Sequence, residues 1–337
     1  MLFSHQPMRT LIVGVGALGG TIATRGISAG APIWLATRSP QSAAALRASG
    51  LRVSGTGGPA EARSVRVAAA LEYANAEKFD LIVLATKAQD ALEAAPFLAR
   101  LLAPGASLLC IQNGGVSQML SERLGEGVVL GGLSNLGATM VEPGVYEQRN
   151  AGHLLIGEVA GGISDRAMNV AEALRPAIEM RVTANLAGAI WSKLLLNCSV
   201  TTIGALAKQT MRGYMASPAG REVFHRVYDE ALSVALSSGT RLERMIVDPV
   251  PPEGDRSRWV DQILTNYGDI KPSMLQDFER GRRTEIDFIN GYTTEQGRKL
   301  GVAVAMNAAI TAMAHRIERG DTRPDPARLD DLLREAG

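Results

Sequence analysis

The sequence predicts an α/β protein with two domains, an N-terminal doubly wound, mostly parallel sheet and an all-helical C-terminal domain. Up to about residue 185, short apolar runs alternate with helical patterns, as expected for strands joined by crossover helices. From Leu186 onward, long helical stretches dominate and almost no alternating pattern remains. Because 337 residues exceed what one core usually supports, we predict domains over residues 8–185 and 186–337.

The composition argues against several classes of partner. The chain has 35 basic and 34 acidic residues, so no strong net field attracts nucleic acid or an anionic membrane. No stretch of about 18 uncharged apolar residues without helix breakers is present. The two cysteines, Cys110 and Cys198, lie in apolar segments and predict free, buried thiols in a reducing compartment. We expect a cytoplasmic protein that binds a small molecule and no metal, nucleic acid or membrane.

The first elements predict a βαβ unit. Residues 9–13 form a short apolar strand that ends at Gly14, a helical pattern then runs to Ala29, and residues 32–36 form the next strand. Residues 1–7 are expected to be a loose leader without chemical function. The remaining N-terminal elements are predicted as helices over 41–48 and 89–102, strands over 51–53, 64–69, 79–85, 107–111 and 128–133, and a glycine-rich loop over 55–58.

Two further regions complete the expected architecture. Residues 144–158 are predicted to form two strands around 150–152, as an antiparallel extension of the sheet. The clearest helical patterns of the C-terminal domain lie over 187–207, 218–237, 256–267, 274–290 and 307–319, with an exposed proline-rich loop over 247–253.

A glycine motif directly follows the first strand and opens the first helix. It fits the pattern G-x-G-x-x-G and consists of Gly14, Val15, Gly16, Ala17, Leu18 and Gly19. In a Rossmann-type domain the first glycine permits a tight turn, the second lets the backbone approach a pyrophosphate, and the third lets helix and strand pack closely. The simpler alternative is an ordinary glycine-rich turn, but the strand, the spacing and the helix together favour dinucleotide binding.

The end of the second strand indicates which dinucleotide is bound. An acidic residue there would bind the ribose 2′-hydroxyl of NADH, whereas a basic residue would accept the 2′-phosphate of NADPH. The segment 34–39 contains no acidic residue but does contain Arg38, so we predict NADPH. Lys87 follows a buried strand at the same edge of the sheet and is a second candidate for contact with the cofactor.

A polar stripe crosses an otherwise apolar helix. Lys193, Asn197 and Thr201 are spaced at i, i+4 and i+8 and therefore share one helical face. Desolvation of a lysine lowers its pKa toward the range useful for proton transfer. A lysine that reaches solvent beside a hydrogen-bonded asparagine explains the pattern equally well.

The polar segment 271–291 leaves similar alternatives open. Ser273 could cap the following helix, and the charged residues could form its solvated face. Alternatively, Glu285 pairs with a buried lysine and Ser273 binds a substrate carboxylate.

Several motifs occur in an order that resembles the ketopantoate reductase family. They are the glycine motif, Thr86-Lys87, Gln112-Asn113-Gly114, Trp191-Ser-Lys-Leu-Leu-Leu-Asn197, and Ser273-Met-Leu-Gln-Asp277 through Thr284-Glu-Ile-Asp287. The resemblance runs from about Arg9 to Asn307 and implies NADPH-dependent reduction of the 2-oxo acid ketopantoate to pantoate.

The resemblance also implies roles for single residues. Lys193 matches the general acid and Glu285 a carboxylate near both lysine and cofactor. Asn113 matches a residue that touches nicotinamide and substrate. Further substrate positions correspond to Asn197 and Ser273, and further cofactor positions to Arg38, Lys87 and Ala138.

The chain departs from the family pattern at two positions. Thr201 stands where the family usually has a second asparagine, and Met211 aligns with a further one. Thr201 remains a predicted substrate contact, but a threonine lacks the paired donor and acceptor of an amide. A different branched or aromatic 2-oxo acid is therefore an alternative substrate, and a non-catalytic NADPH-binding module is an alternative of another class. The helical domain is a candidate surface for homodimerisation.

Overall fold

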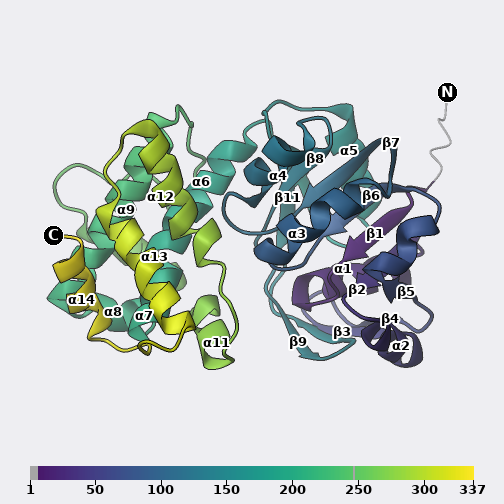
Figure 1. The fold of residues 1–337 in the computed structure, drawn as a ribbon, viewed down its shortest axis with the longest axis horizontal. Coiled ribbons are helices and arrows are strands. Elements are labelled where there is room, and N and C mark those ends of the chain that lie inside the picture. The colour runs from purple at the N-terminus through teal and green to yellow at the C-terminus, as the bar shows by residue number, and fades with distance from the viewer. Residues whose placement is uncertain (1–6, 246) are drawn as a thin grey trace. The chain divides into compact units, whose positions relative to one another are not determined.

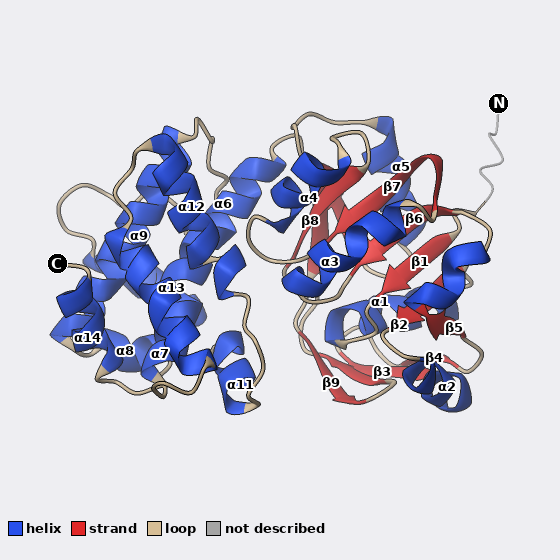
Figure 2. Ribbon diagram, viewed as in Figure 1, coloured by secondary structure: helices blue, strands red, loops and turns tan. Residues whose placement is uncertain are grey.

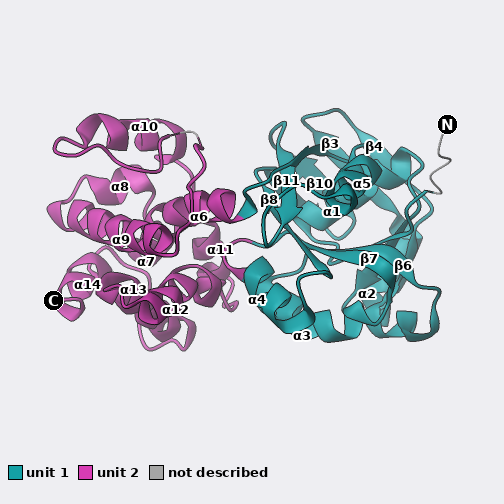
Figure 3. Cartoon of the chain, turned by 90° about the horizontal axis from the view of Figure 1, so that it is seen from above, with its two compact units in different colours: residues 1–112, 116–186 teal, residues 113–115, 187–337 magenta. Residues whose placement is uncertain are grey.

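The structure, a computed structural model, describes residues 7–245 and 247–337, which divide into two compact units (Figure 3). Unit 1 runs up to residue 112 and includes residues 116–186, whereas unit 2 comprises residues 113–115 and 187–337. The large sheet belongs to unit 1 and unit 2 is helical, which confirms the predicted fold class (Figure 2). Of the predicted leader over 1–7, all but Pro7 lies outside the described residues.

Unit 1 is built on an eight-stranded sheet in which the neighbouring strands are parallel, except for one antiparallel pair, β11 and β8 (Figure 1). In sheet order the strands are β12 (Glu179–Val182), β11 (His153–Glu158), β8 (Val129–Ser134), β7 (Leu102–Cys110), β6 (Phe79–Leu84), β1 (Thr10–Val13), β2 (Ile33–Thr37) and β5 (Arg66–Ala69). From β1 the chain passes first to β2 and later to β6 and β7 on the other side. The strand order therefore reverses between β1 and β6, and ligands of such sheets bind at that point of reversal.

Helices cover both faces of this sheet. Right-handed crossovers in opposite directions place α1 (Ala17–Ser28) and α3 (Ala88–Ala99) on opposite faces. The other helices of unit 1 are α2 (Pro40–Ser49), the 3-10 helix η1 (Ala70–Asn75), α4 (Val116–Leu124) and α5 (Asp165–Leu174).

A second, four-stranded sheet packs against α1 and was not anticipated from the sequence. Its strands, in sheet order, are β4 (Ala60–Ala62), β3 (Leu51–Gly55), β10 (Val145–Gln148) and β9 (Ala138–Glu142). The prediction that residues 144–158 form a strand pair in one sheet is therefore wrong, because β10 joins the small sheet and only β11 extends the large one. Asn150, in the connecting turn, accepts a hydrogen bond from the Gly137 amide at 2.8 Å and so ties that turn to β9 instead of closing a hairpin.

The first helix of unit 2 is continuous but changes its winding. It consists of α6 (Leu186–Leu196), a π-helical turn η2 (Asn197–Thr201) and α7 (Thr202–Ala207). By length and composition this 22-residue segment could cross a membrane, yet 72% of its most apolar window is buried inside the structure. It is the core helix of unit 2.

The long helix α9 (Pro218–Ser237) packs against η2, α8, α12, α13 and α14, whereas α11 packs against α7. The other helices of unit 2 are α8 (Met211–Met215), α10 (Ser257–Tyr267), α11 (Ser273–Glu279), the 3-10 helix η3 (Ile286–Phe288), α12 (Asn290–Leu300), α13 (Ala305–Glu318) and α14 (Arg328–Glu335). The loop predicted over 247–253 does connect α9 to α10. Only part of it is exposed, because Val247, Pro249 and Pro251 are buried.

The prediction of one helix over 274–290 is wrong, because α11 ends at Glu279. The chain leaves helical conformation after Glu279 and passes Gly281, whose φ of +60° lies in the left-handed region that favours glycine. The backbone amide of Thr284 then donates to Glu318 at 2.7 Å, a contact that a continuous helix would not allow. Helical structure resumes fully only at Asn290.

A buried polar network joins three helices of unit 2 to the π-helical turn. Glu230 on α9 accepts hydrogen bonds from the backbone amides of Met306 and Asn307 at the start of α13. The Asn307 side chain donates to Glu230 at 2.8 Å and accepts from Asn290 at 3.0 Å. Asn290 donates in turn to the Cys198 carbonyl at 3.3 Å. This network anchors the backbone of η2 inside the core.

Candidate active site

The glycine motif has the geometry that dinucleotide binding requires. Gly14 has a φ of +98°, and a Cβ atom there would overlap Ala85 and Thr86 on the neighbouring strand end. A Cβ atom at Gly19 would overlap the carbonyl oxygen of Gly14, so helix and turn can touch only because residue 19 is glycine. At Gly16, by contrast, an added Cβ would meet no atom within 4 Å. The motif is closed toward the protein and open where a pyrophosphate would approach the amino end of α1.

A tyrosine from the small sheet fixes this turn from behind. Tyr146 on β10 is fully buried, and its hydroxyl donates to the carbonyl of Val15 at 3.1 Å. Its ring fills the space beside Gly20, where a Cβ atom would overlap it. Burial raises the pKa of Tyr146 to about 12, so the hydroxyl stays a donor. The sequence gives no local signal for this contact, because Tyr146 lies 131 residues after Val15.

The other predicted cofactor residues of unit 1 follow β2 and β6 or begin β9. Arg38 follows β2, is largely exposed, and forms an ion pair of 2.8 Å with Asp90 on α3. Lys87 immediately precedes α3, and Ala138 is the first residue of β9. The Oγ1 atom of Thr86 is buried and has no hydrogen-bond partner among the described residues. A ligand at this edge would meet the Arg38 guanidinium and the Thr86 hydroxyl.

The residues of the polar stripe are the partly exposed positions of the core helix. Between Trp191 and Ala207 every residue is buried except Lys193, Asn197 and Thr201, which are partly exposed. This pattern agrees with the periodicity of the sequence and gives the helix one polar, accessible edge.

Side-chain hydrogen bonds stabilise the π-helical turn that carries two of these residues. The Thr201 hydroxyl donates to the Asn197 carbonyl at 2.8 Å, and the Ser199 hydroxyl donates to the Leu195 carbonyl at 2.7 Å. Such turns are rare and frequently occur at functional sites. Because the hydroxyl hydrogen of Thr201 is used within the helix, its oxygen can offer a ligand only an acceptor.

Lys193 and Glu285 of unit 2 interact through their opposite charges. Burial lowers the pKa of Lys193 from its ordinary value to about 8, and the negative charge of Glu285 partly opposes this shift. The structure therefore brings together the two residues predicted as catalytic. A lysine with a pKa near neutrality can both stabilise a developing negative charge and donate a proton.

Asn113 is connected to the segment that carries Glu285. The amide of Gly115 donates to the Phe288 carbonyl at 3.3 Å, and Gly114, with a φ of +77°, leaves no room there for a Cβ atom. Tyr292 packs against Gly115 and lies 5.8 Å, between ring centroids, from Trp191 on the lysine helix. These contacts hold the loop 113–115 beside the turn η3 and the start of the core helix.

Ser273 occupies a different position from the one its capping role would require. It is the first residue of α11 and follows the N-cap residue Pro272, so of the two alternatives for Ser273 the capping role is not the one realised. Pro272 packs against Gly204 of α7, which places exposed Ser273 close to that helix. Met211, by contrast, is buried in the core of unit 2.

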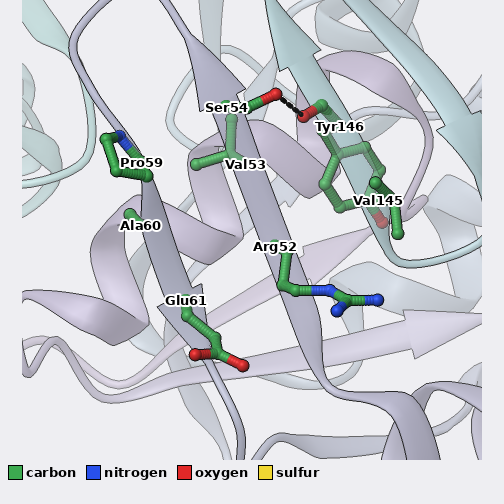
Figure 4. Close-up of a pocket in the computed structure, with 8 residues that line it drawn as sticks. All are labelled: Arg52, Val53, Ser54, Pro59, Ala60, Glu61, Val145 and Tyr146. Atoms are coloured by element: carbon green, nitrogen blue, oxygen red, sulfur yellow. Dashed lines mark hydrogen bonds between the residues drawn. The ribbon is translucent and has the colours of Figure 1, made fainter.

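A surface hollow of unit 1 lies apart from the predicted site residues. A hollow of about 440 Å³ lies on the small sheet between β3, β4 and β10, and its lining includes none of the predicted site residues (Figure 4). Residues 7–245 and 247–337 contain no cluster of three His, Cys, Asp or Glu side chains able to hold a metal ion. Both cysteines are buried thiols outside any disulfide, as predicted.

Comparison with known proteins identifies close relationships over most of the chain. Residues 10–161 match the family model for ketopantoate reductase PanE/ApbA, and residues 185–318 match the model for its C-terminal part. The 2-dehydropantoate 2-reductase of Pyrococcus abyssi is 31% identical, over 90% of this chain and 95% of the relative.

Solved structures lead to the same result. The crystal structure of 2-dehydropantoate 2-reductase from Geobacter metallireducens has a TM-score of 0.78 and 26% identity, covering 92% of this chain and 99% of that one. D-mandelate dehydrogenase, in a ternary structure with NADH and anilino(oxo)acetate, shares the fold with a TM-score of 0.76 at 21% identity, over 92% of this chain and 99% of that one.

The depressed pKa of Lys193 makes a prediction about stability. A charged lysine with a folded-state pKa of about 8 destabilises the folded protein below that pH, and the penalty disappears as pH rises toward the unfolded value of about 10.5. Lys193→Met should therefore increase the free energy of unfolding near pH 7 by up to about 3 kcal/mol, with the gain declining between pH 8 and 10.5. Urea denaturation at several pH values measures this, with the exposed Lys299→Met as control. A pH-independent difference would contradict the pKa shift.

Proposed function

The chain belongs to the ketopantoate reductase PanE/ApbA family, and from this membership we propose that it reduces the 2-oxo group of 2-dehydropantoate to the alcohol of pantoate with NADPH. The family's members are NADP-dependent oxidoreductases acting on CH–OH groups, and the chain is an enzyme of that class. The observation that supports the specific reaction best is Lys193, with a pKa of about 8 opposite Glu285 on the open edge of the core helix. A cytoplasmic location and homodimerisation through unit 2 are part of the proposal.

The cofactor residues of the proposal fit an NADPH molecule chemically. The turn from Gly14 to Gly19 offers open space and helix amides to the pyrophosphate. Arg38 supplies a guanidinium for the 2′-phosphate. The remaining contacts in the proposal are Lys87, Asn113, Ala138 and Glu285. Bound NADPH would supply the hydride.

Lys193 is the proposed general acid. When a hydride adds to the 2-oxo carbon, the electron pair of the C=O bond moves to oxygen, and the Lys193 ammonium stabilises this charge and then donates the proton. One hydride and one proton thus convert C=O to CH–OH. Glu285 favours the protonated form of Lys193 before the reaction, because its charge raises the lysine pKa against the effect of burial.

Asn113, Asn197, Thr201 and Ser273 are the proposed substrate contacts. The Thr201 oxygen is available only as an acceptor, so it suits a substrate hydroxyl that donates, as that of 2-dehydropantoate does. The same observation keeps a second candidate open. A branched or aromatic 2-oxo acid without that hydroxyl would leave Thr201 with its internal hydrogen bond only, at little cost.

The proposed reaction is tested by steady-state NADPH oxidation with a panel of 2-oxo acids. We expect 2-dehydropantoate to give the highest kcat/KM. A branched or aromatic 2-oxo acid ranking far above it would favour the second candidate. Tight NADPH binding without oxidation by any of these acids would instead support a non-catalytic binding module.

The pH dependence tests the role of Lys193. Because only the ammonium form can donate the proton, kcat/KM should fall tenfold per pH unit above about 8. Lys193→Ala should lower kcat by about two to four orders of magnitude and remove this decline. Near-normal turnover by the variant would rule out Lys193 as the acid.

Cofactor preference tests Arg38. Loss of a charge-assisted contact to phosphate costs about 1.5–3 kcal/mol, so Arg38→Ala should raise the KM for NADPH roughly 10- to 100-fold and leave the KM for NADH nearly unchanged. Arg63→Ala is a suitable control, because Arg63 also forms an exposed ion pair in unit 1. Equal effects of Arg38→Ala on both cofactors would contradict recognition of the 2′-phosphate by Arg38.

A further inference from the structure

A histidine on α13 bridges two carboxylates in unit 2. The Nε2 atom of His315 lies 2.8 Å from Oδ1 of Asp287, and its Nδ1 atom lies 3.0 Å from Oε2 of Glu318. Ionised carboxylates only accept hydrogen bonds, so both contacts form together when each ring nitrogen carries a hydrogen.

The second oxygen of each carboxylate accepts hydrogen bonds from residues just before Glu285. Oε1 of Glu318 accepts from the backbone amide and from the hydroxyl of Thr284, both at 2.7 Å. Oδ2 of Asp287 accepts from Arg283 at 3.0 Å. Glu285 therefore lies in a short segment, residues 284–288, that is held to α13 through the residue before it and the residue two positions after it.

Side-chain contacts to α13 hold the segment 284–288, which has little helical structure and no strand of its own. The chain between α11 and α12 contains only the single 3-10 turn η3, so few backbone hydrogen bonds fix its path. The two arginines near His315 have other partners, since Arg316 on α13 pairs with Glu335, and Arg319, directly after α13, pairs with Asp321. Within the described residues, His315 is the side chain that joins the two carboxylates.

We propose that His315 is a positioning residue of the active site, which holds the segment 284–288 so that Glu285 faces Lys193 and the Phe288 carbonyl receives the loop that carries Asn113. The proposal rests on the proposed function for its catalytic consequence. His315 itself touches neither Lys193 nor the loop 113–115 through any described hydrogen bond, and it acts through Asp287 and Glu318.

Three substitutions distinguish the hydrogen bond of His315 to Asp287 from its hydrogen bond to Glu318. His315→Ala removes both bonds, His315→Asn can retain a donor near Nδ1 toward Glu318, and His315→Gln can retain a donor near Nε2 toward Asp287. His225→Asn is the matched control, because His225 is also a partly buried histidine of unit 2 but lies on α9.

We expect kcat to fall about 10- to 100-fold in His315→Ala, less in His315→Asn and His315→Gln, and not in the control. Release of Glu285 also removes the influence that keeps Lys193 protonated, so the alkaline decline of kcat/KM should begin at lower pH in His315→Ala. A variant that is merely less stable would lose active enzyme without moving this decline.

A second measurement does not depend on turnover. The chain has six lysines, so reductive methylation with ¹³C-formaldehyde gives few NMR signals, and Lys193→Met identifies that of residue 193. Its titration should move to lower pH in His315→Ala, move less in His315→Asn and His315→Gln, and stay unchanged in His225→Asn. An unchanged titration in folded His315 variants would overturn the positioning role. A wild-type chain that reduces no 2-oxo acid would contradict the proposed function, while this titration would still decide the role of His315.

Discussion

Lys193 carries its ammonium group on a helix whose residues from Trp191 to Ala207 are buried except for Lys193, Asn197 and Thr201, and the charge of Glu285 offsets part of the cost of placing the ammonium there. Burial of an unpaired charge is expensive, and an apolar side chain would stabilise this position more. The lowered pKa of Lys193 records that cost. The same desolvation makes the lysine a usable acid near neutral pH, so the proposed chemistry and the loss of stability have one physical origin.

The surrounding structure maintains this balance by fixing both partners. On the lysine side, the π-helical turn is bonded through Ser199 and Thr201 within the helix and through Asn290 to the buried network that ends at Glu230. On the carboxylate side, the segment 284–288 depends on side-chain contacts to α13. In unit 1 a side chain distant in sequence likewise fixes a backbone turn, because the Tyr146 hydroxyl donates to the carbonyl of Val15 in the glycine turn.

The sequence predicts the features that depend on local spacing. The glycine motif after a strand and the i, i+4, i+8 stripe of Lys193, Asn197 and Thr201 both reappear in the structure as expected. Features that depend on distant partners were missed. Three contacts join residues far apart in the chain, namely those of Tyr146 with Val15, Asp90 with Arg38, and His315 with Asp287. The small sheet forms because β10 pairs with β3 and not with β11. The helix expected over 274–290 failed for the same reason, because Thr284 bonds to Glu318 and no periodicity in the segment records that contact.

The most direct test of the account is a crystal structure of the enzyme with NADP⁺ and an unreactive analogue of 2-dehydropantoate. The account predicts that Nζ of Lys193 lies within hydrogen-bonding distance of the oxygen that corresponds to the 2-oxo group, and that the 2′-phosphate contacts Arg38. An analogue bound with that oxygen directed toward a different donor, and with Lys193 engaged only by Glu285, would contradict the central claim.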